Sequence, residues 1–310
     1  MNYLLILAGF IILILGGNWL LKAAVGLSLR LNIPKIVIGM TVVSFATSAP
    51  ELIVSVNAAM SGFADISLGN VIGSNIANLG LVLGIVIVLS TISVEKSFYI
   101  TDWPVMMFAS ILFYLFIKFD GIISRGEGII FVLLLVFFLI YLLKFQKKAV
   151  VEDDELEEIE LPVYLSLLYL SLGGLGLWAG SELLVKGAVN LANELGVSER
   201  VIGVTIISIG TSVPELAASV IAIIKKEKAI SLGNLLGSNI FNIFGVIGVT
   251  SIITPIKAVD DKLISYDLIW MLVFAIMIFP LVFTPVKMKL SWKEGLILLG
   301  CYTVFITLML

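Results

Sequence analysis

The sequence predicts an all-α polytopic membrane protein whose ten transmembrane helices form two inverted five-helix repeats. Three observations support this fold class: an apolar composition, ten long apolar segments, and an internal repeat. Of the 310 residues, 60% are hydrophobic and only 13% are charged, and the mean hydropathy is +1.16. Soluble domains are typically about half apolar and about a quarter charged. The chain is therefore expected to reside in the lipid bilayer.

Apolar segments of about 20 residues, the length that crosses a hydrocarbon core, recur along the whole chain. We place the ten spans near residues 2–22, 36–60, 66–91, 99–118, 127–145, 162–190, 200–224, 230–253, 264–284 and 293–309. Five spans on each side of a charged segment give two transmembrane repeats. The repeats are expected at residues 1–145 and 162–310, with a linker at 146–161.

Positive charge is distributed unevenly over the connecting loops. Thirteen of the 19 Lys and Arg residues lie in the loops after the odd-numbered spans, and six lie on the opposite face. The positive-inside rule then predicts a cell-membrane protein with both termini extracellular and the central loop cytoplasmic. That loop, KKAVVEDDELEEIEL, is expected to be a solvated acidic linker, and a regulatory cation-binding site is the alternative.

The two halves share an internal repeat at an offset of 164 residues, at which Glu215 matches Glu51 and Asn242 matches Asn78. The matches include PEL at 50 and 214, ISLGN at 66 and 230, and GSNI at 73 and 237. Five spans separate the copies, so the second copy is inverted in the membrane. A duplicated scaffold alone predicts matching glycines and apolar residues. Matching carboxylates and amides inside the bilayer instead indicate a secondary transporter with a midplane site.

The second span carries FATSAPELIVS, and the seventh repeats the arrangement as SIGTSVPELAAS. In a helix, the hydroxyls of Ser44, Thr47, Ser48 and Ser55 lie on the same face as Glu51. The corresponding face of the seventh span carries Ser208, Thr211, Ser212, Glu215 and Ser219. Pro50 and Pro214 are expected to loosen these helices around Ala46 and Gly210, which frees carbonyl oxygens for the same site.

Spans three and eight carry GNVIGSNIAN and GNLLGSNIFN. Their glycines have a spacing that lets helices approach closely. Ser74 with Asn78, and Ser238 with Asn242, are expected to offer oxygens toward the glutamate helices. Histidine is absent and Cys301 is the sole cysteine, so the donors are carboxylates, amides, hydroxyls and carbonyls. Such ligands favour hard cations such as calcium and sodium.

The paired segments TSAPE with GSNIAN and TSVPE with GSNIFN closely resemble the two alpha-repeats of the cation/calcium exchanger superfamily, in particular its prokaryotic sodium/calcium exchangers. The resemblance covers the whole chain. It implies alternating access, in which a gate bundle of spans one and six slides against a core of the other eight. It also implies no cofactor besides the transported Ca²⁺ and Na⁺.

The resemblance assigns ion binding to oxygen donors from both repeats. The implied set is Glu51, Glu215, Thr47, Ser48, Thr211, Ser212, the backbone carbonyls of Ser44 and Ser208, the side chains of Ser74 and Ser238, and the amides of Asn78 and Asn242. Two ionised glutamates carry a charge that matches one calcium ion or two sodium ions. The set therefore supports competition between the two ions and leaves the stoichiometry open.

Three departures from the family pattern bear on ion preference. Ser44 and Ser208 stand where relatives commonly have alanine or glycine, so an extra hydroxyl is expected to face the pathway. Asn242 stands where potassium-dependent branches carry an aspartate, which favours a potassium-independent exchanger. GSNIAN and GSNIFN lack the acid that the proton/calcium branch usually has in this segment, so proton coupling is not expected.

We expect a sodium/calcium antiporter that uses inward sodium movement to expel calcium. Its expected partners are the two ions and the bilayer, with no nucleic acid, and it is expected to act as a monomer and not as an enzyme. A proton/calcium or other cation exchanger is the nearest alternative. A passive calcium channel and an intramembrane enzyme are more distant ones.

Overall fold

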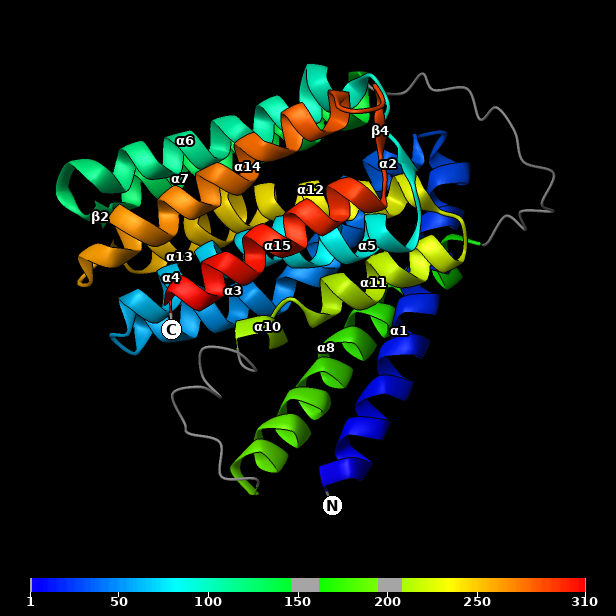
Figure 1. Ribbon diagram of the computed structural model, residues 1–310, viewed down its shortest axis with the longest axis horizontal. Coiled ribbons are helices and arrows are strands. Elements are labelled where there is room, and N and C mark those ends of the chain that lie inside the picture. The colour runs from blue at the N-terminus through cyan, green and yellow to red at the C-terminus, as the bar shows by residue number, and fades with distance from the viewer. Residues whose placement is uncertain (1, 146–161, 195–207, 310) are drawn as a thin grey trace. The chain divides into compact units, whose positions relative to one another are not determined.

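The computed structural model describes residues 2–145, 162–194 and 208–309, and these residues are almost entirely helical (Figure 1). The first half contains α1 (Asn2–Leu31), α2 (Lys35–Ile38), η1 (Gly39–Val43), α3 (Ser44–Met60), α4 (Ala64–Ala77), η2 (Asn78–Val82), α5 (Leu83–Leu89), β1 (Ile92–Ser93), η3 (Phe98–Asp102), α6 (Trp103–Asp120), β2 (Ile122–Ile123) and α7 (Arg125–Phe145), where η denotes a π-helical turn.

The second half contains α8 (Val163–Glu194), α10 (Ser208–Gly210), α11 (Val213–Ile224), α12 (Lys228–Ile240), η5 (Phe241–Ile247), α13 (Gly248–Ile253), β3 (Ile256–Lys257), η6 (Leu263–Asp267), α14 (Leu268–Phe283), β4 (Lys289–Leu290) and α15 (Trp292–Met309). From α4 to α7 and from α12 to α15, the same kinds of element follow one another in the same order. The internal repeat of the sequence is thus also a repeat of local structure.

Nine helical segments in the described residues are long and apolar enough to cross a membrane, and α11 is a shorter apolar helix. Their outward faces are apolar: on α1, for example, Leu4, Phe10 and Ile14 are exposed. Helices that are apolar over most of their circumference are typical of membrane spans. The protein is therefore a multi-pass, all-α membrane protein, as the composition predicts.

Two features of the predicted spans are wrong. The first helix does not end near residue 22 but continues to Leu31, because Lys22 does not interrupt it. A lysine can extend its apolar stem along the helix, and Nζ of Lys22 lies 5.9 Å from the centroid of the Tyr169 ring. The seventh span is not one continuous helix in its described part, because α10 ends at Gly210 and α11 begins at Val213.

The acidic linker predicted at residues 146–161 and the predicted start of the seventh span near residue 200 lie outside the described residues. The linker's role therefore stays a prediction.

The chain forms two compact units, and each contains segments of both halves. The first unit comprises Met1–Thr47 and Phe138–Asn234, and the second comprises Ser48–Phe137 and Leu235–Leu310. The boundary predicted at the linker separates the two repeats along the sequence, but it does not separate the two compact units. The compact units instead combine segments of both repeats, and these segments are not equivalent: the first unit ends at Thr47 in the first repeat but continues in the second to Asn234, the counterpart of Asn70.

In the first unit, α1 and α8 pack closely along glycine positions. A Cβ atom on Gly9 would lie 2.8 Å from the main-chain oxygen of Gly180, and one on Gly173 would lie 2.6 Å from the main-chain nitrogen of Leu20. Gly173 and Gly180 follow Gly9 and Gly16 by 164 residues, so the contact uses the same positions of both repeats. Within membranes, such close backbone approach is a main source of helix association.

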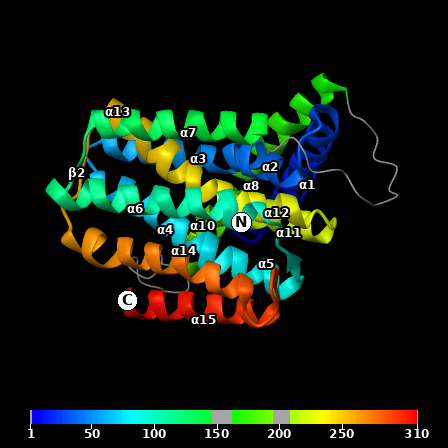
Figure 2. The same ribbon diagram turned by 90° about the horizontal axis from the view of Figure 1, so that it is seen from above.

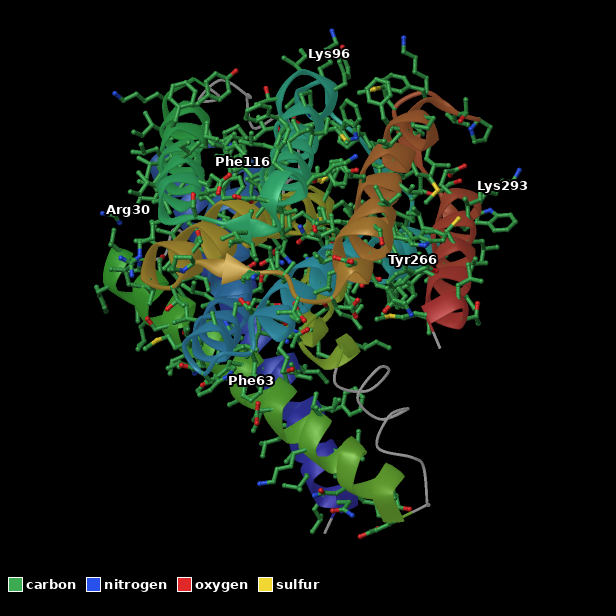
Figure 3. All side chains as sticks on the ribbon, turned by 90° about the vertical axis from the view of Figure 1, so that its left-hand side faces the viewer. Arg30, Phe63, Lys96, Phe116, Tyr266 and Lys293 are labelled. Carbon is green, nitrogen blue, oxygen red and sulfur yellow. The ribbon has the colours of Figure 1, made fainter. Side chains whose placement is uncertain are left out.

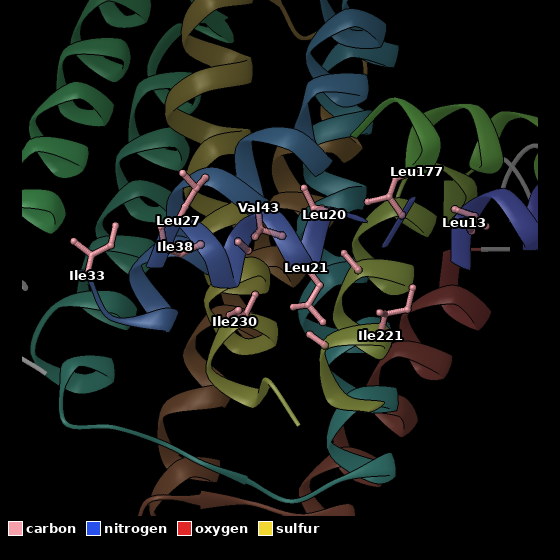
Figure 4. Packing of buried hydrophobic residues seen from close by; sticks show 13 residues of the cluster. Leu13, Leu20, Leu21, Leu27, Ile33, Ile38, Val43, Leu177, Ile221 and Ile230 are labelled. Carbon is pink, nitrogen blue, oxygen red and sulfur yellow. The ribbon is translucent and has the colours of Figure 1, made fainter. Parts of the chain in front are cut away.

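Buried apolar side chains continue this packing in the first unit. Leu20 and Leu21 of α1, Leu177 of α8 and Ile221 of α11 belong to one cluster of buried residues (Figure 4). Because lipid chains are as apolar as these side chains, their contribution comes from close packing rather than from removal from water. The cluster joins α11, which carries Glu215, to the α1–α8 pair.

In the second unit, two short antiparallel strand pairs connect the halves. Strand β1 pairs with β4, and β2 pairs with β3. Strands β1 and β3 occupy equivalent places in the two repeats, as do β2 and β4. Each pair therefore joins a strand of one repeat to a strand of the other, which is the exchange that a twofold relation between the repeats produces.

Helix packing in the second unit follows the same exchange. A Cβ atom on Gly295 of α15 would lie 2.8 Å from the main-chain oxygen of Gly84 on α5, and one on Gly128 of α7 would lie 2.7 Å from that of Gly248 on α13. Helices α6 and α14 lie side by side (Figures 1 and 2). The ring of Phe116 on α6 lies 5.3 Å from that of Phe131 on α7 (Figure 3). Helices α5 and α13, which take part in these contacts, directly follow the π-helical turns η2 and η5 that carry the predicted amides Asn78 and Asn242.

Candidate cation-binding site

The twelve residues predicted to bind cations are divided equally between the two units. The first unit contains Ser44, Thr47, Ser208, Thr211, Ser212 and Glu215. The second unit contains Ser48, Glu51, Ser74, Asn78, Ser238 and Asn242. Each unit thus contains one glutamate and five neutral residues of the predicted set.

Glu51 lies near the middle of α3 and is fully buried. Ser44, Thr47, Ser48 and Ser55 are also buried on this helix, so the predicted common face of the second span is confirmed. Transfer of a carboxylate from water to a protein interior costs several kcal/mol unless charge and hydrogen bonds compensate for it.

Asn70 of α4 fixes the backbone around Glu51. Its Nδ2 atom donates to Ser55 Oγ at 2.9 Å and to the main-chain oxygen of Glu51 at 3.3 Å. In the first unit, Asn234 repeats the first of these bonds, because its Nδ2 donates to Ser219 Oγ at 3.1 Å. The sequence-based site omitted both asparagines. The signal was present, since they are the final residues of the two ISLGN copies, 164 residues apart.

The predicted amides of the second unit are fully buried in π-helical turns. Asn78 begins η2 and Asn242 lies in η5. Such turns are rare and are often found at functional sites. Among the described residues, neither Oδ1 nor Nδ2 of Asn78 has a hydrogen-bond partner, and Oδ1 of Asn242 has none. Ser74 and Ser238 are buried on α4 and α12.

In the first unit, Ser44 and Thr47 contact Asn234. The hydroxyl of Ser44 lies 2.7 Å from the main-chain oxygen of Gly39 and 3.0 Å from that of Asn234. Thr47 Oγ1 lies 3.2 Å from Asn234 Oδ1 and 3.3 Å from the main-chain oxygen of Ser44. Two main-chain acceptors thus lie within hydrogen-bond distance of the Ser44 hydroxyl, and the expectation that it faces the pathway stays a prediction. The side chain of Ser208, its repeat equivalent, lies outside the described residues.

The second proline motif behaves differently from the first. Pro50 lies inside α3, which is unbroken. The prediction that Pro50 loosens this helix around Ala46 is therefore wrong. Pro214 lies in the first turn of α11, and Thr211 and Ser212 form a turn before it. The predicted common helical face of the seventh span is therefore interrupted. A proline can open a helix or be accommodated within it, and the surrounding packing decides which occurs.

The opening before α11 places Glu215 in the first turn of a helix, where it is fully buried. The free backbone N–H groups and the dipole of a helix N-terminus favour negative charge there. Ser212 precedes the helix and is buried, whereas Thr211 is partly exposed. Within the described part of the chain, no hydrogen bond is formed by the hydroxyl of Ser212.

Ser181 of α8 supports the same opening. Its hydroxyl donates to the main-chain oxygen of Gly210 at 2.9 Å. This is the carbonyl that Pro214, having no N–H, cannot bond within a helix. The repeat equivalent of Ser181 is Gly17, which has no hydroxyl to offer to Ala46. This difference provides a physical reason for the unequal behaviour of the two prolines.

The described donors are hydroxyls, amides, carbonyls and two glutamates. Among the described residues, no group of three or more His, Cys, Asp or Glu side chains could hold a metal ion. Neutral oxygens that accompany single carboxylates suit hard cations that bind and leave.

Comparison with protein families places these observations among transporters. The family model described as "Sodium/calcium exchanger protein" matches residues 1–144 and 165–310. A putative antiporter, CaxA of Alkalimonas amylolytica, is 41% identical over 256 residues, which cover 81% of this chain and 80% of CaxA. The inner membrane protein YrbG of Escherichia coli is 32% identical over 98% of this chain and 95% of its own.

Two further similarities concern proteins whose names state an exchange activity. The sodium/calcium exchanger MaX1 of Methanosarcina acetivorans is 28% identical over 99% of this chain and 98% of MaX1. The solved structure of the sodium-calcium exchanger NCX_Mj has a TM-score of 0.84 and 29% identity, and the match covers 100% of this chain and 99% of that one. The likeness extends over both repeats.

Proposed function

Because the chain belongs to the sodium/calcium exchanger family, we propose that it is an antiporter that exchanges sodium for calcium by alternating access. Exchange of cations against calcium is the activity of the family. Sodium as the counter-ion, and the residues that bind both ions, are the finer parts of this proposal.

The observation that carries the proposal is a symmetric pair of fully buried glutamates. Glu51 and Glu215 occupy the same position in two repeats, and each is followed four residues later by a serine held by an asparagine. Buried negative charges require compensation, and bound cations are one source of it. One calcium ion or two sodium ions would neutralise them. The same residues can thus bind either one calcium ion or two sodium ions, and binding of one kind of ion excludes the other.

Neutral oxygens complete the proposed site. We assign to it the side chains of Thr47, Ser48, Thr211, Ser212, Ser74, Ser238, Asn78 and Asn242 and the backbone carbonyls of Ser44 and Ser208. The engagement of the Ser44 hydroxyl by main-chain acceptors supports its carbonyl, rather than its side chain, as the ligand. The buried and unbonded amide oxygens of Asn78 and Asn242 support their assignment.

Alternating access requires a part of the protein that moves. We propose that α1 and α8 move together as a gate, and their close packing through glycines of both repeats supports this. The bond from Ser181 to Gly210 connects α8 to the seventh span. A sliding motion of α8 would break that bond, so its presence would depend on the conformational state.

The excess of Lys and Arg in the odd-numbered loops supports a cell-membrane orientation with both termini extracellular and residues 146–161 in the cytoplasm. We propose that the protein functions in the bilayer as a monomer, because the two repeats together supply both halves of the proposed site.

The counter-ion can be identified with purified protein in lipid vesicles. Calcium uptake should follow an outward sodium gradient, and it should fall to the level of protein-free vesicles when potassium or an outward proton gradient replaces sodium. Added potassium should not stimulate the sodium-driven uptake, because Asn242 is a neutral amide. Uptake driven equally by a proton gradient would replace this proposal with a proton/calcium exchanger.

A further inference from the structure

Four asparagines form a buried amide group in the second unit. Asn75 and Asn78 come from one GSN-x-x-N segment, and Asn239 and Asn242 come from its repeat. Each is at most 1% exposed. Asn78 and Asn242 belong to the proposed site, whereas Asn75 and Asn239 do not. A buried amide without hydrogen bonds destabilises the protein, so the orientation of each amide decides which of its two ends is bonded.

The hydrogen bonds of Asn75 determine which way its amide faces. Its Nδ2 atom lies 3.3 Å from the main-chain oxygen of Asn239 and 3.7 Å from Sδ of Met271. A carbonyl oxygen and a thioether sulfur can only accept hydrogen bonds. The NH₂ end of Asn75 must therefore face these two atoms, and its Oδ1 must face the opposite way.

This orientation is passed on to Asn242. Oδ1 of Asn75 lies 3.0 Å from Nδ2 of Asn242. Because Oδ1 can only accept, Asn242 must turn its NH₂ end to it. The Oδ1 atom of Asn242 then points away from this bond, and it has no hydrogen-bond partner among the described residues. An amide oxygen is a ligand for calcium and sodium, whereas an NH₂ group would repel them.

The repeat-related pair lacks this arrangement. The equivalent bond would join Asn78 Nδ2 to Asn239 Oδ1, yet both atoms are without a hydrogen bond among the residues that the structure describes. Asn239 instead donates from Nδ2 to the main-chain oxygen of Leu235, one turn back on its own helix, at 3.1 Å. Only one of the two proposed amide ligands is oriented by a neighbouring asparagine in this structure.

We propose that Asn75 is a positioning residue that holds the amide of Asn242 with its oxygen available for the transported cation. The inference rests on the proposed function, because it concerns a ligand of the same site. Without Asn75, the amide of Asn242 can rotate between two orientations, and one of them presents the NH₂ group. Calcium affinity then falls without removal of any ligand.

Equilibrium binding of calcium to the purified full chain in detergent tests this role. Asn75→Ala should raise the dissociation constant for calcium about tenfold, the factor expected when one interaction with a charged ligand is lost. Asn239→Ala is the matched control and should stay within about twofold of the unmutated protein, because among the described residues that side chain bonds only within its own helix.

A rescue separates positioning from a general structural effect. Aspartate at position 242 presents oxygen in either orientation, so Asn75→Ala should have no further effect on calcium affinity in an Asn242→Asp background. A structural role for Asn75 would instead weaken binding equally in both backgrounds. If Asn75→Ala is poorly folded, the same cycle with Asn75→Ser gives the comparison.

The outcomes for the two proposals are distinct. Absence of calcium binding by the unmutated chain would remove the proposed function and this inference with it. Calcium binding by the unmutated chain, with equal affinity in Asn75→Ala, would overturn the positioning role and leave the exchanger proposal intact.

Discussion

Replacement of either buried glutamate by glutamine is expected to reduce sodium-driven calcium uptake by at least about a hundredfold. Glutamine keeps the volume and one oxygen of the side chain, but it replaces the other oxygen with NH₂ and removes the charge. Loss of one partner from a buried ionic interaction costs about 3–5 kcal/mol, which corresponds to factors of about a hundred to several thousand. Glu51→Gln and Glu215→Gln should be equally damaging, since both residues are fully buried at equivalent positions.

Glu95→Gln is the control for this experiment, because Glu95 is exposed between α5 and η3. It should transport calcium at the unmutated rate. Uptake is measured with radioactive calcium in vesicles at matched protein content, and folding is checked by monodisperse elution in detergent. Calcium uptake at near-normal rates in either buried-site variant would remove that glutamate from the site.

Gly173→Ala is expected to lower the free energy of unfolding by about 1–3 kcal/mol, the usual range for overpacking. The new Cβ would lie 2.6 Å from the main-chain nitrogen of Leu20, and a backbone atom on α1 cannot be displaced without shifting that helix. Since we propose that α1 and α8 move as one gate, sodium-driven calcium uptake should fall as well.

The neighbouring glycine provides a matched control. A Cβ on Gly174 would meet its nearest atom, Cβ of Ala46, at 3.6 Å, which is ordinary contact. Gly174→Ala should preserve or raise thermal stability, because alanine favours the helix by up to about 1 kcal/mol. Thermal unfolding in detergent measures both variants. Equal stability of the two would show that the close approach of α1 and α8 at Gly173 does not matter.

Much of the fold could be predicted because a membrane span can be recognised from its average hydropathy alone. Long apolar segments predicted the helical class, and the repeat offset predicted which spans are equivalent, such as the third and the eighth. The end of the first helix could not be predicted from its charge pattern, because a charged residue does not always mark the end of a span. Lys22 instead continues the helix and lies near the ring of Tyr169. Whether a lysine can be accommodated within a helix in this way depends on the side chains of the neighbouring helix, and these cannot be predicted from the sequence of one span.

The candidate site shows where local patterns reach their limit. The two proline motifs have similar sequences, yet α3 continues through Pro50, whereas the helix of the seventh span is interrupted just before Pro214. The difference lies in a distant residue, Ser181, whose counterpart is Gly17. Asn70 and Asn234 are distant in sequence from the glutamates and lie on other helices, so helical spacing around Glu51 and Glu215 does not predict them. Their hydrogen bonds to Ser55 and Ser219 cross between helices.

Uphill calcium transport is the most direct test of sodium/calcium exchange. Sodium-loaded vesicles are transferred to a medium in which the sodium concentration is one tenth of that inside. The calcium concentration is equal on both sides, and the membrane potential is held at zero. Each sodium ion that leaves supplies about 1.4 kcal/mol. We expect calcium to accumulate inside well above the external concentration, and to leave again when a sodium ionophore dissipates the gradient. Calcium that only equilibrates across the membrane, at a level unaffected by the sodium gradient, would contradict exchange and indicate a passive channel.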